Sequence, residues 1–362
     1  MRRVWLEPRW RPCDAVGRPA LPLEALFGRE RLVAAFGRCR DAFWWIARGL
    51  SGARWTCWLP AYGCHQMAAP FERALHDVQY YDVDEDGNPN WSTIPTEIDA
   101  AGSAPRLLLV ADTFGYPPVV SHDTRDRISR AFDIVVRDAA HSLPGAVPEP
   151  IPGRCGTYSV YSFRKALGTA DGAFVTVPSR QDGIREDTPT HGCVTSHRNT
   201  LYLAIEWIGR GVPPFRAAAP YRWSRVALRE QRLGVPMSRL DRCFVRRLDI
   251  HAATERRRRN ATRLAEALPV PTLRHDHEVA SPLYFPIRTR NAADAANVLQ
   301  RHGVESFAAW TLDHVPDVAR RFPMSQRLAN TIVGLPVHQD LINADVSQIA
   351  SAVQALRREH LA

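Results

Sequence analysis

The sequence predicts an α/β fold, in which a large and mainly parallel sheet flanked by helices is followed by a smaller α+β C-terminal domain. In the first half, six short apolar runs alternate with helical or turn segments. These runs are almost continuously apolar, as strands covered on both faces must be. After Pro178 the pattern changes, and a shorter alternation returns near residue 280. We therefore expect a large domain at 1–239 and a connecting helix with a small domain at 240–362.

The elements of the large domain follow from this pattern. Residues 23–36 are expected to form a first helix, 37–40 a turn, and 41–50 a second helix. Strands alternating with helices favour right-handed crossovers between parallel neighbours. The runs expected to form the large sheet are 55–59, 78–83, 107–111, 134–137, 157–163 and 174–177.

The second half begins with residues 179–236, which are rich in Arg, Pro, Gly and aromatic residues. We expect long loops there, with one helix at 200–208. A long helix at 240–268 ends before two prolines, which cannot continue it. The elements expected in the small domain are strands at 281–287, 305–308 and 332–335 and helices at 292–302 and 345–357.

Composition points to a soluble enzyme of the cytoplasm. Of 362 residues, 45% are hydrophobic and 23% are charged, and no apolar run is long enough to cross a bilayer. Arg2 and Arg3 are not followed by an apolar segment, so no secretory signal is expected. The seven cysteines include no CxxC pair, which indicates reduced thiols and no metal site.

The net charge of +9 raises the possibility of nucleic-acid binding. The arginines, however, are spread along the chain and interleaved with acids. The densest run, 256–259, falls in an expected helix, where four consecutive residues point in four directions and mostly face solvent. We therefore expect attraction to anionic small molecules and no nucleic-acid partner.

Lys165 is the only lysine in the chain, since the remaining 46 of the 47 basic side chains are arginine. Arginine cannot lose its proton in a protein, so it cannot act as an amine nucleophile. A single retained lysine is a candidate for amine chemistry, above all a Schiff base with an aldehyde. The alternative is chance survival at the surface, and composition alone leaves both interpretations open.

Two candidate groups follow neighbouring expected strands. Asp138 ends the run 134–138, and Lys165 follows the run 157–163. Open parallel sheets bind ligands at the carboxyl ends of their strands. An amine beside a carboxylate suits pyridoxal phosphate, which needs a lysine for its aldehyde and an acid for its ring nitrogen.

Six segments in order resemble motifs of the DegT/DnrJ/EryC1/StrS family of pyridoxal-phosphate enzymes, most of them sugar aminotransferases. The resemblance covers about residues 30–355. It implies the type I fold of pyridoxal-phosphate-dependent transferases. The segments are Gly37-Arg38, Leu59-Pro-Ala-Tyr-Gly-Cys-His65, Asp112-Thr-Phe-Gly-Tyr-Pro117, Asp138-Ala-Ala-His141, Ser162-Phe-Arg-Lys165 with Asp171-Gly172, and Leu335-Pro-Val-His-Gln339.

By this resemblance, Lys165 forms the Schiff base, Asp138 is the partner of the ring nitrogen, and His141 lies beside the ring hydroxyl. Each residue also has a plainer interpretation. A strand-end aspartate is commonly a turn cap, and a single histidine is commonly an ordinary loop residue.

The same resemblance implies the rest of the cofactor site. Ser162 would donate its hydroxyl to the phosphate, and the backbone of Arg38 and Cys39 would supply N–H groups at a helix N-terminus. Either Tyr62 or His65 would stack on the ring, and the sequence does not choose between them. Ser162 could equally point into the sheet.

The implied activity is a ping-pong transfer of an amino group from glutamate or glutamine to a keto group of a nucleotide-linked sugar. Arginines within 210–232 are candidates to hold the diphosphate. A homodimer with the active site at its interface is also implied. Two alternatives stay open: a non-sugar substrate (an aminocyclitol, small ketone or amino-acid derivative), or a regulatory homologue without catalysis.

Overall fold

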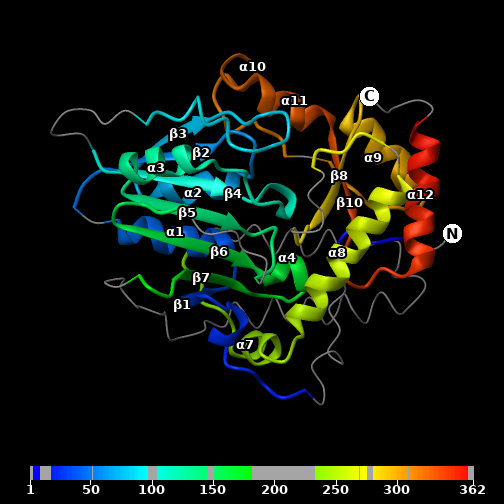
Figure 1. Cartoon of the computed structure of the whole chain (residues 1–362), viewed down its shortest axis with the longest axis horizontal. Coiled ribbons are helices and arrows are strands. Elements are labelled where there is room, and N and C mark those ends of the chain that lie inside the picture. Colours follow the sequence, from blue (N-terminus) through cyan, green and yellow to red (C-terminus); the bar gives the residue numbers. More distant parts are fainter. Residues whose placement is uncertain are drawn as a thin grey trace.

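The structure is a computed structural model, shown in Figure 1. It describes residues 3–8, 18–50, 52–96, 104–144, 151–181, 233–268, 270–274, 280–308 and 310–357. The expected helix at 200–208 and the arginines at 210–232 lie outside these residues. Within the described part of the chain, no helix is both long and apolar enough to cross a membrane.

A seven-stranded sheet dominates the molecule, with the strand order β1-β7-β6-β5-β4-β2-β3. β7 is antiparallel to both of its neighbours, whereas the other pairs are parallel. All six strands expected here are present, and the predicted fold class is confirmed. The strands are β1 (Glu30–Phe36), β2 (Thr56–Pro60), β3 (Asp77–Tyr81), β4 (Arg106–Ala111), β5 (Ile134–Ala139), β6 (Gly156–Ser162) and β7 (Ala173–Pro178).

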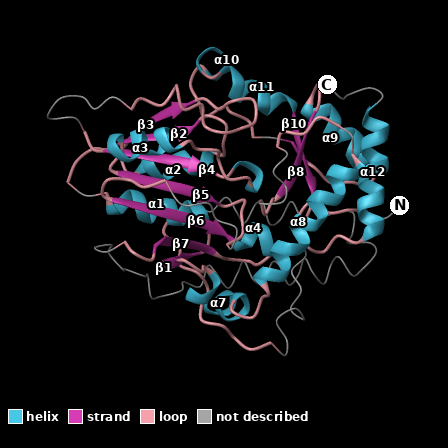
Figure 2. Cartoon of the chain, in the orientation of Figure 1, coloured by secondary structure: helices cyan, strands magenta, loops and turns pink. Residues whose placement is uncertain are grey.

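Helices cover both faces of this sheet (Figure 2). Along β4, Leu107 and Leu109 pack in one core cluster, whereas Leu108 and Val110 pack in another. Since alternate residues of a strand point to opposite faces, these clusters lie on opposite sides of the sheet. The first contains residues of α1 (Cys39–Gly49) and α2 (His65–Arg73), and the second contains Ile128 of α3 (His122–Ala131).

A second, three-stranded antiparallel sheet with the order β8-β10-β9 forms the smaller layer, at the right of Figure 1. Its helices α9 and α12 pack together, and α12 also packs on α8. Val4 pairs with Val304 and joins this core, so the first described residues lie beside the last part of the chain. The domain boundary at 239/240 stays a prediction. The elements are β8 (Tyr284–Arg288), β9 (Phe307–Ala308), β10 (Ile332–Pro336), α8 (Ile250–Ala267), α9 (Ala292–Arg301) and α12 (Asn343–Arg357).

The prediction of a helix at 23–36 is wrong. The structure has a short 3-10 turn, η2 (Glu24–Leu26), followed by Gly28 with φ 61° and then by the edge strand β1. The buried carboxylate of Glu30 accepts hydrogen bonds from Thr176 of the neighbouring β7 (3.0 Å) and from Ser159 and Tyr161 of β6, the next strand in (2.7 Å each). These distant partners decide the local structure.

The single long helix expected at 240–268 is also wrong, because it is two helices. The first is α7 (Arg239–Val245), and α8 starts anew after Asp249, whose side chain accepts a hydrogen bond from the Ala252 N–H. The backbone N–H of Leu21 reaches Arg246 in the break. An aspartate at this position favours a new helix start over continuation.

The arginine run 256–259 only partly faces solvent. Arg256 and Arg259 are exposed and Arg258 is half-buried, but Arg257 is 1% exposed. Three short elements and a turn were not predicted either: α4 (Phe163–Leu167), α10 (Val318–Arg321), α11 (Pro323–Thr331) and the 3-10 turn η3 (Thr113–Gly115).

Candidate functional site

The candidate site lies where the parallel strands of the large sheet have their C-terminal ends. Asp138 on β5 is paired in parallel with Ala111 on β4 and with Val160 on β6. β7 starts at Ala173, which lies opposite Ser162 on one side and Phe36 on the other. Because parallel strands end together, the segments after β1, β2, β4, β5 and β6 meet at this edge. Every site residue expected from the sequence lies in or beside one of them.

Lys165 lies on α4, three residues after β6 ends, and its side chain is half-buried. It makes no hydrogen bond or ion pair with the residues that the structure describes. Its charge nevertheless acts on Asp138, His141 and Cys39. The only lysine amine of the chain is therefore next to the groups expected beside it, and it remains available for a ligand.

Asp138 is 9% exposed and accepts a hydrogen bond from the Ala140 N–H at 2.9 Å. Burial raises the pKa of its carboxyl group to about 6, although the nearby Lys165 and the Ala140 N–H both work in the opposite direction. The carboxylate is thus held at the strand end without a strong ion pair. A protonated ring nitrogen would supply the missing cationic partner.

His141 lies under the Trp310 indole, with ring centroids 5.7 Å apart and ring planes 18° apart. Burial lowers its pKa well below 6.5, and the Lys165 charge lowers it further. His141 is therefore a neutral imidazole at physiological pH. A neutral ring can hydrogen-bond a ligand hydroxyl without adding a second cation beside the lysine.

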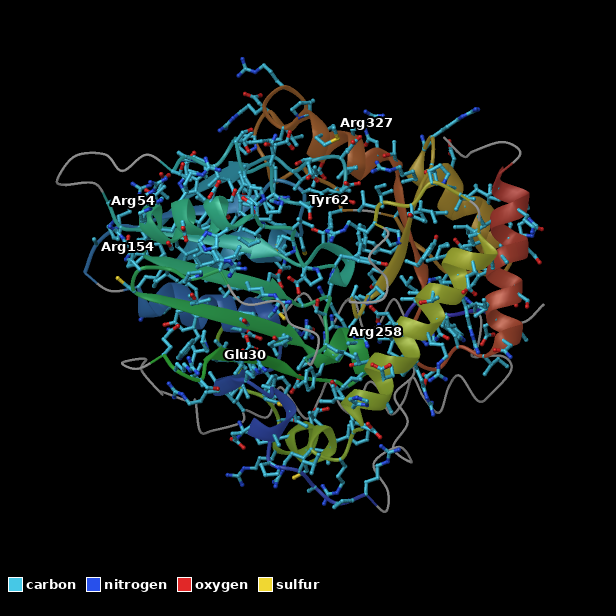
Figure 3. All side chains as sticks on the ribbon, in the orientation of Figure 1. Glu30, Arg54, Tyr62, Arg154, Arg258 and Arg327 are labelled. Carbon is cyan, nitrogen blue, oxygen red and sulfur yellow. The ribbon has the colours of Figure 1, made fainter. Side chains whose placement is uncertain are left out.

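An aromatic cluster lies between the large sheet and the smaller one. Trp310 stacks on Phe114 (5.8 Å, 22°) and meets the edge of Tyr62 (5.0 Å, 78°). Phe114 has φ 57°, a left-handed conformation that is uncommon for a residue with a side chain. Figure 3 shows Tyr62 between the two sheets.

The structure separates the two residues that were expected to compete for the cofactor ring. Tyr62 is 1% exposed, and its buried hydroxyl has no hydrogen-bond partner among the described residues. His65 is exposed, and its ring lies 5.2 Å from that of His314. Tyr62 is inside the site and His65 is at its rim. A buried hydroxyl without a partner is costly, which indicates a ligand that satisfies it.

The N-terminus of α1 forms the cationic end of the site. The N–H of Arg38 donates to the Asp41 carboxylate at 3.1 Å, but the N–H of Cys39 has no acceptor in the described part of the chain. The Cys39 thiol bonds to the Ser162 side chain and donates to the Tyr161 carbonyl at 3.6 Å. These groups give the hydroxyl and the free N–H that a phosphate needs.

Repulsion between arginine side chains at the N-terminus of α1 also favours binding of an anion there. Burial lowers the pKa of Arg38 to about 10, and the neighbouring guanidinium groups of Arg164 and Arg40 lower it further. Asp41 and Asp171 offset part of this repulsion. An anion bound among the three arginines would relieve the rest.

Gly37, which comes just before α1, lies against the segment 171–172. A Cβ atom on Gly37 would lie 3.3 Å from the Asp171 carboxylate, so a larger residue there would require Asp171 to shift by a few tenths of an ångström. Asp171 is fully buried and accepts a hydrogen bond from the Ser238 N–H at 3.2 Å. Asp171 thus ties the segment beside Gly37 to Ser238, and its charge also offsets part of the repulsion at Arg38.

The residues present fit pyridoxal phosphate. A free amine, a buried carboxylate, a neutral imidazole, a buried phenol without a partner and a cationic helix N-terminus lie along one edge. Within the described residues, no group of three or more His, Cys, Asp or Glu side chains could hold a metal ion.

Comparison with known proteins gives a family match. The profile of the DegT/DnrJ/EryC1/StrS aminotransferase family matches residues 68–354, which include Asp138, Ser162 and Lys165. None of the curated proteins matches the chain.

Solved structures share the fold over nearly the whole chain. A DegT DnrJ EryC1 StrS aminotransferase from Brucella abortus has 18% identity and a TM-score of 0.61, covering 94% of this chain and 92% of that chain. The sugar aminotransferase CalS13 from Micromonospora echinospora has 18% identity and a TM-score of 0.58, with 89% and 86% covered. PseC from Helicobacter pylori, an aminotransferase involved in the biosynthesis of pseudoaminic acid, has 12% identity and a TM-score of 0.63, with 98% and 99% covered. The predicted type I fold is confirmed.

Proposed function

Because the chain belongs to the DegT/DnrJ/EryC1/StrS aminotransferase family, and is therefore a pyridoxal-phosphate-dependent aminotransferase, we propose that it aminates a nucleotide-linked keto-sugar. Glutamate or glutamine is the proposed donor, in a ping-pong reaction. The observation that carries the proposal is the single lysine amine beside a buried carboxylate and a neutral imidazole, at the edge where the strands end.

Each residue of the site has a proposed task. Lys165 holds the cofactor aldehyde, Asp138 pairs with the ring nitrogen, and His141 bonds the ring hydroxyl. Tyr62, rather than His65, lies against the ring, because Tyr62 is buried and His65 is exposed.

The phosphate is assigned to the helix end. Ser162 supplies its hydroxyl, and the Cys39 N–H at the start of α1 supplies a donor, whereas the Arg38 N–H that was also expected to bind the phosphate donates to Asp41. The Cys39 N–H supports this assignment most directly because it has no acceptor in the described chain. The guanidinium charges of Arg38, Arg40 and Arg164 add attraction without touching the ring.

Bound there, pyridoxal phosphate supplies an electron sink for the donor α-carbon. With the cofactor bound, the Lys165 amine would be the group placed to accept the proton from that carbon as a general base. Asp138 keeps the ring nitrogen protonated by pairing with it. His141 orients the ring hydroxyl while remaining uncharged.

The keto-sugar assignment rests on the family, on the named activities of similar structures, and on net charge. CalS13 is a sugar aminotransferase, and PseC is an aminotransferase involved in the biosynthesis of pseudoaminic acid. The charge of +9 suits an anionic nucleotide sugar. We further propose that arginines of 210–232 hold its diphosphate, that two chains share each active site, and that the enzyme works in the cytoplasm.

The test measures the reaction with the amino donor separately from the reaction with the ketone. Protein loaded with pyridoxal phosphate is mixed with glutamate or glutamine alone, and the oxo acid released is counted. A ping-pong enzyme releases one equivalent per site and then stops until a ketone is added. A panel of nucleotide-linked keto-sugars and small free ketones then restarts turnover. Restart only with the free ketones would reject the sugar assignment, and no oxo acid from either donor would reject the donor assignment.

A further inference from the structure

The helix that carries Lys165 cannot fix its own position. α4 has only five residues and ends before Gly168, which has φ 69°. A helix this short has almost no intrinsic stability, and its last carbonyl groups lack partners within the helix. The orientation of the Lys165 amine therefore depends on contacts from outside the helix, which are the packing of Phe163, Ala166 and Leu167 in the core and the partners of these carbonyls.

Arg257 holds one of them from another element. This residue of α8 is 1% exposed, and its Nη2 donates to the Ala166 carbonyl at 2.5 Å. Its Nη1 donates to the Pro282 carbonyl at 3.0 Å, and its Nε donates to the Gln339 Oε1 at 3.0 Å. Gln339 completes the set, since its Nε2 donates to the same Ala166 carbonyl at 3.3 Å.

These hydrogen-bonded residues connect the segment after β6 of the large sheet to segments beside the smaller sheet. Ala166 directly follows Lys165, Pro282 lies two residues before β8, and Gln339 lies three residues after β10. A cation at the C-terminal end of a helix is favourable. One guanidinium group therefore joins the helix carrying the lysine to two segments beside the smaller sheet, and these three hydrogen bonds all go to uncharged oxygens.

If Arg257 served only to stabilise the fold, its buried charge would be an unfavourable choice. Burial lowers the pKa of Arg257 to about 10, and the charge of Asp340 is the largest influence in the opposite direction. Burying a cation costs several kcal/mol, and an apolar side chain of similar size is often no less stable. The planar fork of arginine, however, can bond three oxygens in fixed directions, which an apolar side chain cannot do.

We propose that Arg257 and Gln339 are a positioning pair, which fixes the Lys165 amine against Asp138 by holding the Ala166 carbonyl. The inference rests on the proposed role of Lys165. Neither residue is assigned contact with substrate or cofactor. Their effect passes through the backbone of α4, and it links the smaller sheet to the reacting amine.

The experiment compares Arg257→Met with Arg256→Met, the adjacent and exposed arginine of the same helix. Each protein is loaded with pyridoxal phosphate, and the pH at which its Schiff-base absorbance titrates is measured. Unfolding temperature, kcat and KM for the amino donor are measured alongside. We expect Arg257→Met to shift the titration midpoint by about one pH unit or more, because the amine and Asp138 no longer keep their distance.

The kinetic split distinguishes positioning from binding. Arg257→Met should lower kcat by about 10–100-fold, because misplacing a reacting group by about 1 Å costs this much, with KM for the donor nearly unchanged. Arg256→Met should match the unsubstituted enzyme in titration midpoint and kcat. Gln339→Met, which keeps the arginine, should shift both quantities in the same direction as Arg257→Met but less.

Three results decide the matter. If Arg257→Met and Gln339→Met both fold and match Arg256→Met in titration midpoint and kcat, the positioning pair is rejected. If Arg257→Met does not fold, Gln339→Met decides alone by the same two quantities. If the unsubstituted enzyme forms no Schiff base, the proposed function itself fails, and the premise of the pair fails with it.

Discussion

Asp138, which we propose to pair with the cofactor, weakens the fold of the cofactor-free protein. Its folded pKa of about 6 lies above the ordinary value of 3.8, so the folded state disfavours the charged form. The free energy of unfolding is therefore lowered as pH rises from about 4 to about 6, and this loss stays constant at higher pH. The difference between the two pKa values corresponds to about 3 kcal/mol in the cofactor-free protein.

Asp138→Asn should therefore raise the free energy of unfolding of the cofactor-free protein at pH 8, by up to about 3 kcal/mol. The gain should shrink toward pH 4, and affinity for pyridoxal phosphate should fall. Denaturant unfolding at several pH values measures the first effect, with the exposed Asp126→Asn on α3 as control. A loss of stability at pH 8 would mean that attraction to Lys165 outweighs burial.

For single residues, the sequence predicted which side chains are candidates for the site but not how deeply each is buried. The bias toward arginine made Lys165 visible, and the strand pattern placed Asp138 and Lys165 at one edge. Nothing local distinguished Tyr62 from His65, because Tyr62 is buried by residues distant in sequence, among them Phe114 and Trp310. Arg257 looked like part of a solvated run for the same reason.

Helix α1 contributes to the site through its backbone. Proline is tolerated at the first helical position, where it removes only the N–H. Arg38 has φ −143° and ψ 157°, the extended conformation that a following proline requires. Cys39→Pro should therefore leave the helix intact and remove one phosphate donor.

The expected effect of Cys39→Pro is a weaker affinity for pyridoxal phosphate, by roughly 10–150-fold. This range corresponds to about 1.5–3 kcal/mol for a hydrogen bond to a charged group. Cys39→Ala is the matched control, since it removes the same thiol and keeps the N–H. Titration of the cofactor-free proteins gives both dissociation constants. Equal affinities of the two variants would place the phosphate elsewhere.

Element boundaries were predictable where the signal was local. The apolar runs of the large sheet predicted all six of their strands. β1 was mistaken for helix because Glu30 is fixed by partners that lie about 130 and 146 residues along the chain. The break between α7 and α8 depends on Asp249 as a cap, a signal that was present in the sequence but was outweighed by the apolar periodicity.

For the molecule as a whole, the two sheets are also joined away from the site. Asp82, which follows β3, accepts hydrogen bonds from the Met324 N–H at 3.2 Å, the Ser325 N–H at 2.9 Å and the Ser325 hydroxyl at 2.6 Å. These groups belong to the first turn of α11. The carboxylate is 6% exposed and caps a helix that packs beside the smaller sheet.

Asp82→Ala should lower the free energy of unfolding by about 1–3 kcal/mol, because it leaves buried N–H groups without an acceptor. The nearby Asp86→Ala removes only a more exposed ion pair with Arg288 and should cost at most about 1 kcal/mol. Denaturant unfolding compares the two. Equal losses would show that Asp82 does not join the sheets.

The most direct test of the whole account is the visible absorption spectrum of the protein with pyridoxal phosphate, before and after glutamate. The unsubstituted enzyme should show a Schiff-base band that glutamate converts to the band of pyridoxamine phosphate. Lys165→Arg keeps the positive charge but has no lysine amine left, so it should show no such band. The same band in Lys165→Arg would contradict the assignment of Lys165, and its absence from both proteins would contradict the proposed site.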